Sequence, residues 1–242
     1  MKTFIAKDYE ELSKIAAEKM ISVVRNKPNA VLGLATGSTP LGLYQKMIED
    51  HLQNGTSYQG VRAVNLDEYA GLAPSNPQSY RYFMRSNLFD KINIKLENTY
   101  IENGLAADEE AECARYNGIL AALPRDIQLL GIGANGHIAF NEPGTPFDSE
   151  THVVELTENT IEMNARFFEN KEEVPRRAFT MGIKNITDAK SVLILACGAS
   201  KAKAVYGLVK GEITEELPAS ILQRHKDCIL IADREAAAFI GE

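Results

Sequence analysis

Four short segments of the sequence combine small residues with side chains that bind anions or move protons. The first, GLATGSTPLGLY (Gly33–Tyr44), follows an apolar run and leads into a predicted helix near Pro40. Gly37 allows close approach of the backbone to a ligand, while Ser38 and Thr39 add hydroxyl and N–H groups at a helix N-terminus. This pattern is typical of a phosphate-binding loop, but a plain helix start with proline in its first turn has the same composition.

Carboxylates follow the next apolar run. Asp67 and Glu68 lie in VNLDEYAGL (Val64–Leu72), directly after a predicted strand. A carboxylate in this position can act as a general base if it points into a cleft. Taken by itself, the segment favours the alternative, a solvent-exposed acid at a helix start or in a loop.

The third segment, LLGIGANGHIAFNEPG (Leu129–Gly144), is a glycine-rich loop that carries Asn135, His137 and Glu142. An imidazole flanked by an amide and a carboxylate is suited to proton transfer. The loop also has the GxGxxG spacing of dinucleotide sites, but prolines follow soon after it, where that motif requires a long helix. We therefore interpret the GxGxxG spacing as coincidental.

The fourth segment, LACGASKAKA (Leu195–Ala204), is again an apolar run, a glycine-containing loop and a predicted helix. Lys201 falls in the first helical turn, where the helix dipole disfavours a cation unless an anion binds at the same N-terminus. The position therefore favours a phosphate contact over a simply solvated lysine. The four histidines are widely spaced and the three cysteines are scattered, so we expect neither a metal site nor a cofactor.

The elements that position these segments alternate between short apolar runs and amphipathic stretches, which predicts an α/β fold with a mostly parallel open sheet and helices on both faces. The predicted strands are Val31–Ala35, Val61–Leu66, Ile127–Ile132, Phe179–Ile183, Val192–Cys197 and Cys228–Ala232. The predicted helices are Tyr9–Arg25, Leu41–Asn54, Ser79–Lys91, Asp108–Ala122 and Ser200–Lys210. Because ligands of such sheets bind beyond the carboxyl ends of the strands, the four segments are expected to converge.

The domain organisation is predicted to be simple, with one domain over residues 1–242. Residues 141–177 interrupt the alternation with prolines and many charges, and we expect them to form a lid-like excursion. The net charge of −7 argues against a nucleic-acid partner. No apolar run approaches the roughly 20 residues that span a bilayer, and the first residues lack a signal-peptide pattern, so we expect a cytoplasmic protein without a membrane partner.

The motifs TGSTP, LDEY, GIGxxGHIAFNEP and GxSK together resemble the glucosamine-6-phosphate deaminase family, also called the glucosamine-6-phosphate isomerase family. The resemblance extends to LPASILQ (Leu217–Gln223), near the end of the chain. It implies a modified Rossmann-like fold. It also implies the metal-free conversion of glucosamine 6-phosphate and water into fructose 6-phosphate and ammonia, an isomerisation with deamination that belongs to amino-sugar catabolism.

The same resemblance implies individual roles. Asp67 matches the base that moves a proton between C2 and C1, and His137 and Glu142 match the pair that opens the sugar ring. Asn135 stands where well-studied members have aspartate, which predicts an amide–imidazole–carboxylate relay with an altered role for the amide. The positions that match phosphate ligands are Gly37, Ser38, Thr39, Arg166 and Lys201.

Three other functions are considered. A 6-phosphogluconolactonase shares the fold and the phosphate loop, but usually differs after the GH pair. A sugar-phosphate sensor would have lost catalysis, and a nicotinamide dehydrogenase rests on the GxGxxG spacing alone. Within the deaminases, allosteric hexamers have Arg and Lys where this chain has His152 and Val154. We therefore expect a monomer or small homo-oligomer that N-acetylglucosamine 6-phosphate does not activate.

Overall fold

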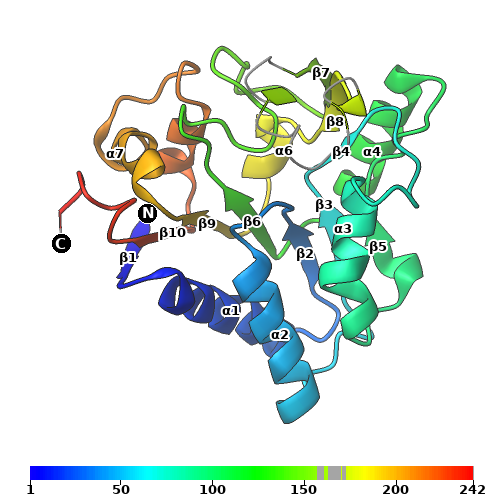
Figure 1. The fold of residues 1–242 in the computed structure, drawn as a ribbon, viewed down its shortest axis with the longest axis horizontal. Coiled ribbons are helices and arrows are strands. Elements are labelled where there is room, and N and C mark those ends of the chain that lie inside the picture. Colours follow the sequence, from blue (N-terminus) through cyan, green and yellow to red (C-terminus); the bar gives the residue numbers. More distant parts are fainter. Residues whose placement is uncertain (157–160, 163–169, 171–172, 242) are drawn as a thin grey trace.

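A seven-stranded sheet forms the centre of the computed structural model, which describes residues 1–156, 161–162, 170 and 173–241 (Figure 1). The strand order is β1-β10-β9-β6-β2-β3-β5, and each neighbouring pair is parallel. The strands of this sheet are β1 (Lys2–Ala6), β2 (Val31–Leu34), β3 (Arg62–Asn65), β5 (Thr99–Tyr100), β6 (Ile127–Gly131), β9 (Val192–Ala196) and β10 (Cys228–Asp233).

Helices cover both faces of the sheet. In Figure 1, α1 and α2 lie on one side of it, and α6 and α7 lie on the other. The α-helices that lie wholly within the described residues are α1 (Tyr9–Asn26), α2 (Leu41–Asn54), α3 (Tyr80–Asn87), α4 (Glu109–Ala122), α6 (Ile183–Thr187) and α7 (Ala202–Lys210). The 3₁₀ turns there are η1 (Phe89–Lys91), η2 (Leu96–Asn98), η4 (Ala199–Lys201) and η5 (Pro218–Arg224). The predicted α/β class and mostly parallel sheet are confirmed.

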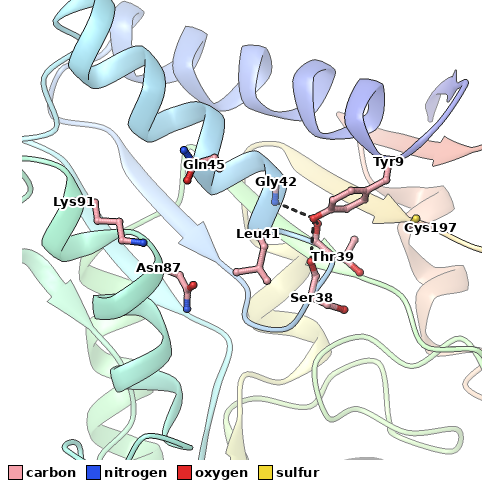
Figure 2. Close-up of a pocket in the computed structure, with 9 residues that line it drawn as sticks. All are labelled: Tyr9, Ser38, Thr39, Leu41, Gly42, Gln45, Asn87, Lys91 and Cys197. Atoms are coloured by element: carbon pink, nitrogen blue, oxygen red, sulfur yellow. Dashed lines mark hydrogen bonds between the residues drawn. The ribbon is translucent and has the colours of Figure 1, made fainter.

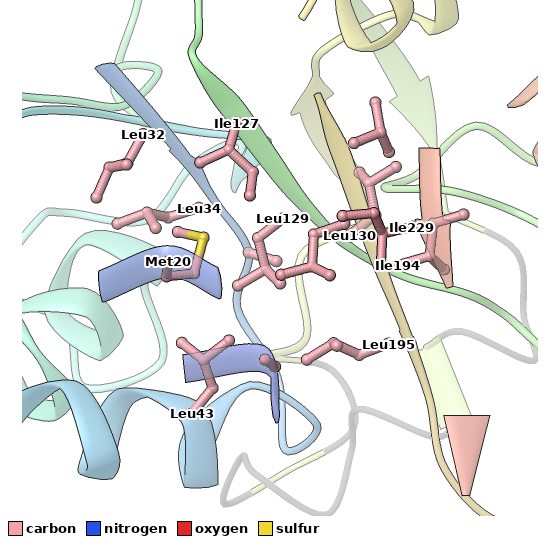
Figure 3. Close-up of a cluster of buried hydrophobic side chains, with 14 of the residues drawn as sticks. Met20, Leu32, Leu34, Leu43, Ile127, Leu129, Leu130, Ile194, Leu195 and Ile229 are labelled. Carbon is pink, nitrogen blue, oxygen red and sulfur yellow. The ribbon is translucent and has the colours of Figure 1, made fainter. Parts of the chain in front are cut away.

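The core explains why the central strands were readable from the sequence. All residues of β2, β9 and β10 are buried, because helices cover both of their faces. Figure 3 shows apolar side chains of β2, β6 and β9 packed together with Met20 of α1 and Leu43 of α2. In α1 the buried Leu12, Ala16 and Met20 recur at helical spacing, so one face of the helix packs on the sheet.

The chain reverses its direction of travel through the sheet between β2 and β6. From β2 the next strands, β3 and β5, lie successively towards one edge, whereas β6, β9 and β10 lie successively towards the other. Ligands of open α/β sheets bind at such a switch point, outside the carboxyl ends of the strands. The loops after β2 and β6 are the TGSTP and GIGxxGH segments, so the topology places them side by side.

A second, three-stranded antiparallel sheet was not predicted. It consists of β4 (Asp67–Tyr69), β8 (Arg177–Thr180) and β7 (His152–Glu155) in the order β4-β8-β7. The predicted strand Phe179–Ile183 was therefore misplaced: its first residues belong to β8 in this sheet, and Ile183 begins α6. The strands β4 and β7 were missed because they are short and rich in charged or polar residues.

Two α-helices are shorter than predicted, and in each case a 3₁₀ turn takes up the rest of the predicted range. The predicted helix Ser79–Lys91 comprises α3, for which Ser79 is the N-cap, and the separate turn η1. The predicted helix Ser200–Lys210 begins as η4 and continues as α7. The predicted excursion at residues 141–177 lies partly outside the described residues. Of its described part, β7 belongs to the second sheet.

Candidate active site

A cavity of about 420 Å³ lies at the carboxyl ends of the central strands, where the four chemically notable segments meet. Six of the predicted site residues line it: Gly37, Ser38, Thr39, Asp67, His137 and Lys201. The predicted convergence of strand ends therefore holds for the loops after β2, β3, β6 and β9. Asn135 and Glu142 contact His137 from behind instead of lining the cavity.

The loop after β2 presents unsatisfied donors to the cavity. Gly37 has a φ of +98°, a left-handed conformation that favours glycine. The amide groups of Gly37, Ser38 and Thr39 make no hydrogen bond to any described part of the chain. Since α2 begins immediately afterwards at Leu41, the loop combines free N–H groups with a helix N-terminus, an arrangement that binds phosphate.

Asp67 and Glu68 are adjacent acids in very different surroundings. Asp67, the first residue of β4, lines the cavity and is only 7% exposed. Burial, with a further contribution from the charge of Glu68, raises the pKa of Asp67 to about 8. The Glu68 carboxylate accepts hydrogen bonds from the N–H groups of Tyr69, Tyr80 and Arg81, and so it binds the N-terminus of α3.

His137 is supported by a carboxylate and an amide. Its Nδ1 lies 3.4 Å from Glu142 Oε1. Asn135 Nδ2 donates to Glu142 Oε2 at 2.6 Å, and Asn135 Oδ1 accepts from the main-chain N–H of His137 at 3.2 Å. The close contact with His137, helped by the hydrogen bond from Asn135, lowers the pKa of Glu142 against the opposing effect of burial. Glu142 is therefore an ionised carboxylate beside the imidazole.

The predicted order of the relay was wrong. The Asn135 side chain contacts the Glu142 carboxylate and the backbone of residue 137, rather than the imidazole ring. The sequence of groups is thus amide–carboxylate–imidazole. Asn135 orients Glu142, which in turn contacts His137, because all three are displayed on one tight loop after β6.

The GxGxxG spacing serves this loop and does not begin a helix. A Cβ on Gly133 would lie 2.3 Å from the His137 imidazole, so glycine is required there for the ring to pack against the backbone. Residues 132–141 contain turns and an isolated bridge between Ile138 and Asn141, without helix. This geometry agrees with our rejection of a dinucleotide motif.

Lys201 closes the cavity on the side of β9. It is the last residue of η4 and takes the N-cap position of α7, at the helix start where it was predicted. Partial burial lowers its pKa, and no carboxylate in the described residues forms an ion pair with it. An anionic ligand would supply the missing partner. Arg166, the other predicted cationic phosphate ligand, lies outside the described residues.

Among the described residues, no helix is long and apolar enough to cross a membrane. They also contain no group of three or more His, Cys, Asp or Glu side chains positioned to hold a metal ion.

Comparison with known proteins places the chain in a family. The family model for glucosamine-6-phosphate isomerases/6-phosphogluconolactonase matches residues 7–231. The chain belongs to this isomerase/lactonase family. It is 52% identical over 243 residues to a glucosamine-6-phosphate deaminase of Geobacillus sp. (strain WCH70), covering 100% of this chain and 97% of that protein. It is also 52% identical over 239 residues to the deaminase of Clostridioides difficile (strain 630), covering 98% and 96%.

A solved structure of this isomerase/lactonase family is similar throughout. It is a monomeric glucosamine-6-phosphate deaminase, 50% identical, with a TM-score of 0.96, and the match covers 98% of this chain and 99% of the other. The family assignment inferred from the motifs is confirmed.

Sequence reasoning missed an aromatic wall in this family member. Tyr69, Tyr80, Phe83 and Phe140 line the cavity. The rings of Tyr80 and Phe140 are stacked, with centroids 6.3 Å apart and planes 8° from parallel. Glu68 of β4 binds the N-terminus of α3, which carries Tyr80, and Phe140 lies 60 positions further along the chain, where its N–H donates to Thr180 Oγ1 of β8. No local pattern in the sequence signalled this wall.

Asn141 was also missed as a site residue. It is fully buried, and its Nδ2 donates to Ile138 O and Met181 O at 2.9 Å each. These bonds fasten the His137 loop to the end of β8. The asparagine of the NEP motif was the available signal in the sequence. A side-chain amide that becomes buried requires hydrogen-bond partners of this kind.

Proposed function

We propose that this protein converts glucosamine 6-phosphate and water into fructose 6-phosphate and ammonia. The observation that carries the proposal is the meeting of a buried carboxylate, an imidazole–carboxylate pair and an anion-binding loop in one cavity, in a chain about half identical to deaminases over its full length. The family also includes lactonases, but the named relatives at this level of identity are deaminases.

The phosphate group of the substrate would bind to the loop after β2. Three free amides at Gly37–Thr39 and the Lys201 ammonium face the same cavity and supply donors and positive charge. Binding the 6-phosphate there uses contacts far from the reacting carbons to orient those carbons. Arg166 stays a sequence prediction for the same role.

Ring opening is assigned to His137 with Glu142. The step breaks the bond between C1 and the ring oxygen, while a proton leaves O1 and one is delivered to the ring oxygen. The ionised Glu142 would stabilise an imidazolium form of His137 while the imidazole carries the proton. Asn135 would orient Glu142 for this task.

Isomerisation and deamination are assigned to Asp67. The carboxylate takes the proton from C2, while the aldehyde oxygen O1 gains a proton and the 2-ammonium group loses one. Return of the C2 proton to C1 then leaves an iminium group at C2. Water then adds to C2 and ammonia leaves, giving the ketone of fructose 6-phosphate. The step requires ionised Asp67, and a positively charged 2-amino group on the bound substrate favours that form despite the raised pKa.

The proposal extends to the form of the protein. We infer a single domain over residues 1–242, because residues from both sheets line one cavity. We also infer a cytoplasmic monomer or small homo-oligomer that acts on a small sugar phosphate and not on nucleic acid. The net charge of −7 and the similar monomeric deaminase support this inference.

The deciding experiment compares two substrates. Purified protein should release ammonia and fructose 6-phosphate in equal amounts from glucosamine 6-phosphate, with a chelator present and without nicotinamide. Hydrolysis of 6-phosphogluconolactone should be much slower. Faster turnover of the lactone than of the amino sugar would assign the chain to the lactonases.

A further inference from the structure

The phosphate-binding loop is a thin wall between two cavities. Ser38 and Thr39 line the site cavity on one side, and they also line a second cavity of about 650 Å³ on the other (Figure 2). The outer side of the loop therefore has little packing against the rest of the protein. Its conformation depends on hydrogen bonds.

One side chain supplies hydrogen bonds on that outer side. Tyr9, the first residue of α1, directs its hydroxyl at the junction between the loop and α2 (Figure 2). The hydroxyl lies 3.0 Å from both Ser38 O and Thr39 O, to which it donates, and it accepts from the N–H of Gly42 at 2.8 Å. Tyr9 lines the outer cavity and not the site cavity.

Because the peptide bond is planar, the hydrogen bond from Tyr9 to Ser38 O also orients the N–H group of Thr39. In a trans peptide the C=O and the following N–H point in opposite directions. When Tyr9 holds the Ser38 carbonyl on the outer side, the Thr39 N–H of the same peptide unit is directed towards the site cavity. The Thr39 N–H is one of the three free amides.

We propose that Tyr9 is a positioning residue that aims the Thr39 N–H at the substrate phosphate. The inference rests on the proposed phosphate role of this loop. Tyr44 holds the opposite end of the loop: it is buried, and its hydroxyl donates to Ala35 O and accepts from Ala35 N–H. The loop is thus fixed at both ends before any ligand arrives, which lowers the entropic cost of binding.

The test is Tyr9→Phe, which removes the hydroxyl and keeps the ring, with Tyr206→Phe as the matched control at an exposed tyrosine of α7. Tyr9→Phe should raise KM for glucosamine 6-phosphate about three- to tenfold, the effect of one hydrogen bond, with kcat changed less than about twofold. The Ki of inorganic phosphate as a competitor should rise by a similar factor. Hydrogen exchange at the Gly42 amide, which loses its acceptor, should become faster.

Several outcomes would overturn the inference. One is an unchanged KM and Ki in Tyr9→Phe, and another is a fall in kcat with KM unaffected, the sign of a merely structural role. A Tyr206→Phe variant with the same changes would also overturn it. If the wild type fails to deaminate glucosamine 6-phosphate but Tyr9→Phe still weakens phosphate binding measured directly, the proposed reaction is wrong and the role of Tyr9 stands.

Discussion

Asp67 is buried at the cavity and keeps its proton to an unusually high pH, and this has a measurable cost. Its pKa is about 8, against an ordinary value of 3.8. Between these values the folded protein holds a proton that the unfolded chain has lost, so the free energy of unfolding falls as the pH rises. The loss of unfolding free energy reaches its full value above the folded-state pKa of Asp67.

Asp67→Asn removes this titration and should reveal the cost. Relative to wild type, the variant should gain thermal stability progressively from about pH 4 to pH 8 and show no further gain above that. Thermal unfolding across this range measures the difference. Asp148→Asn, at an exposed aspartate, should show no such trend. A difference between Asp67→Asn and wild type that is constant with pH would mean that Asp67 titrates normally.

Asn135 donates to Glu142 at 2.6 Å, so its replacement by aspartate exchanges a donor for an acceptor. In Asn135→Asp two carboxylates face each other, and the pair should take up a proton at higher pH than Glu142 does now. Carbon NMR of the carboxyl groups should show the pKa of the pair raised, with most of kcat retained at alkaline pH. An unmoved titration would show that the two side chains separate, and inactivity at every pH would show that the amide is essential.

At the scale of elements, the prediction from sequence succeeded where one cause dominated. The strands β2, β6, β9 and β10 are buried on both faces, so their apolar runs were sufficient to find them. The strand β4 could not be found in this way. It has three residues, DEY, and forms because β8 pairs with it, a partner more than a hundred positions away.

The site followed the same rule. The convergence of Gly37, Asp67, His137 and Lys201 was predictable, because each follows a strand of one parallel sheet. The arrangement of contacts around His137 could not be predicted, because a tight loop can place the Asn135 amide against the imidazole ring or against Glu142. Motif spacing does not distinguish these two arrangements, and only side-chain positions do.

The element that carries Lys201 offers a further test. Lys201 is at the η4–α7 junction and faces the cavity, while Lys203, two residues later, is exposed. Lys201→Ala should raise KM for glucosamine 6-phosphate by about tenfold or more, since charge-assisted hydrogen bonds contribute about 1.5–3 kcal/mol. Steady-state kinetics should show Lys203→Ala unchanged. Equal KM values in the two variants would move the phosphate to another part of the cavity.

At the scale of the whole molecule, the loop before β7 and β7 itself are poorly suited to an anionic effector. Glu150 forms an ion pair with Lys184, and His152 Nδ1 lies 2.8 Å from Glu150 O. Val154 packs against a small apolar cluster formed by Tyr69, Leu156, Ile161, Val174 and Ala178. The charge of Lys184 is thus already used, and valine offers no donor.

We therefore expect hyperbolic kinetics and no activation by N-acetylglucosamine 6-phosphate. Sedimentation should give a monomer or a small oligomer at assay concentrations. Rate curves that are sigmoidal and become hyperbolic with this compound would contradict the expectation, as would a hexamer in sedimentation.

The central claim is that glucosamine 6-phosphate is deaminated in this cavity with Asp67 as the base. The most direct measurement is the rate of ammonia release from saturating glucosamine 6-phosphate by wild type, Asp67→Asn and Asp148→Asn. Wild type and Asp148→Asn should have the same rate, and Asp67→Asn should be about 10²–10⁴-fold slower while still binding fructose 6-phosphate. Ammonia release by Asp67→Asn at a rate near that of wild type would contradict the claim.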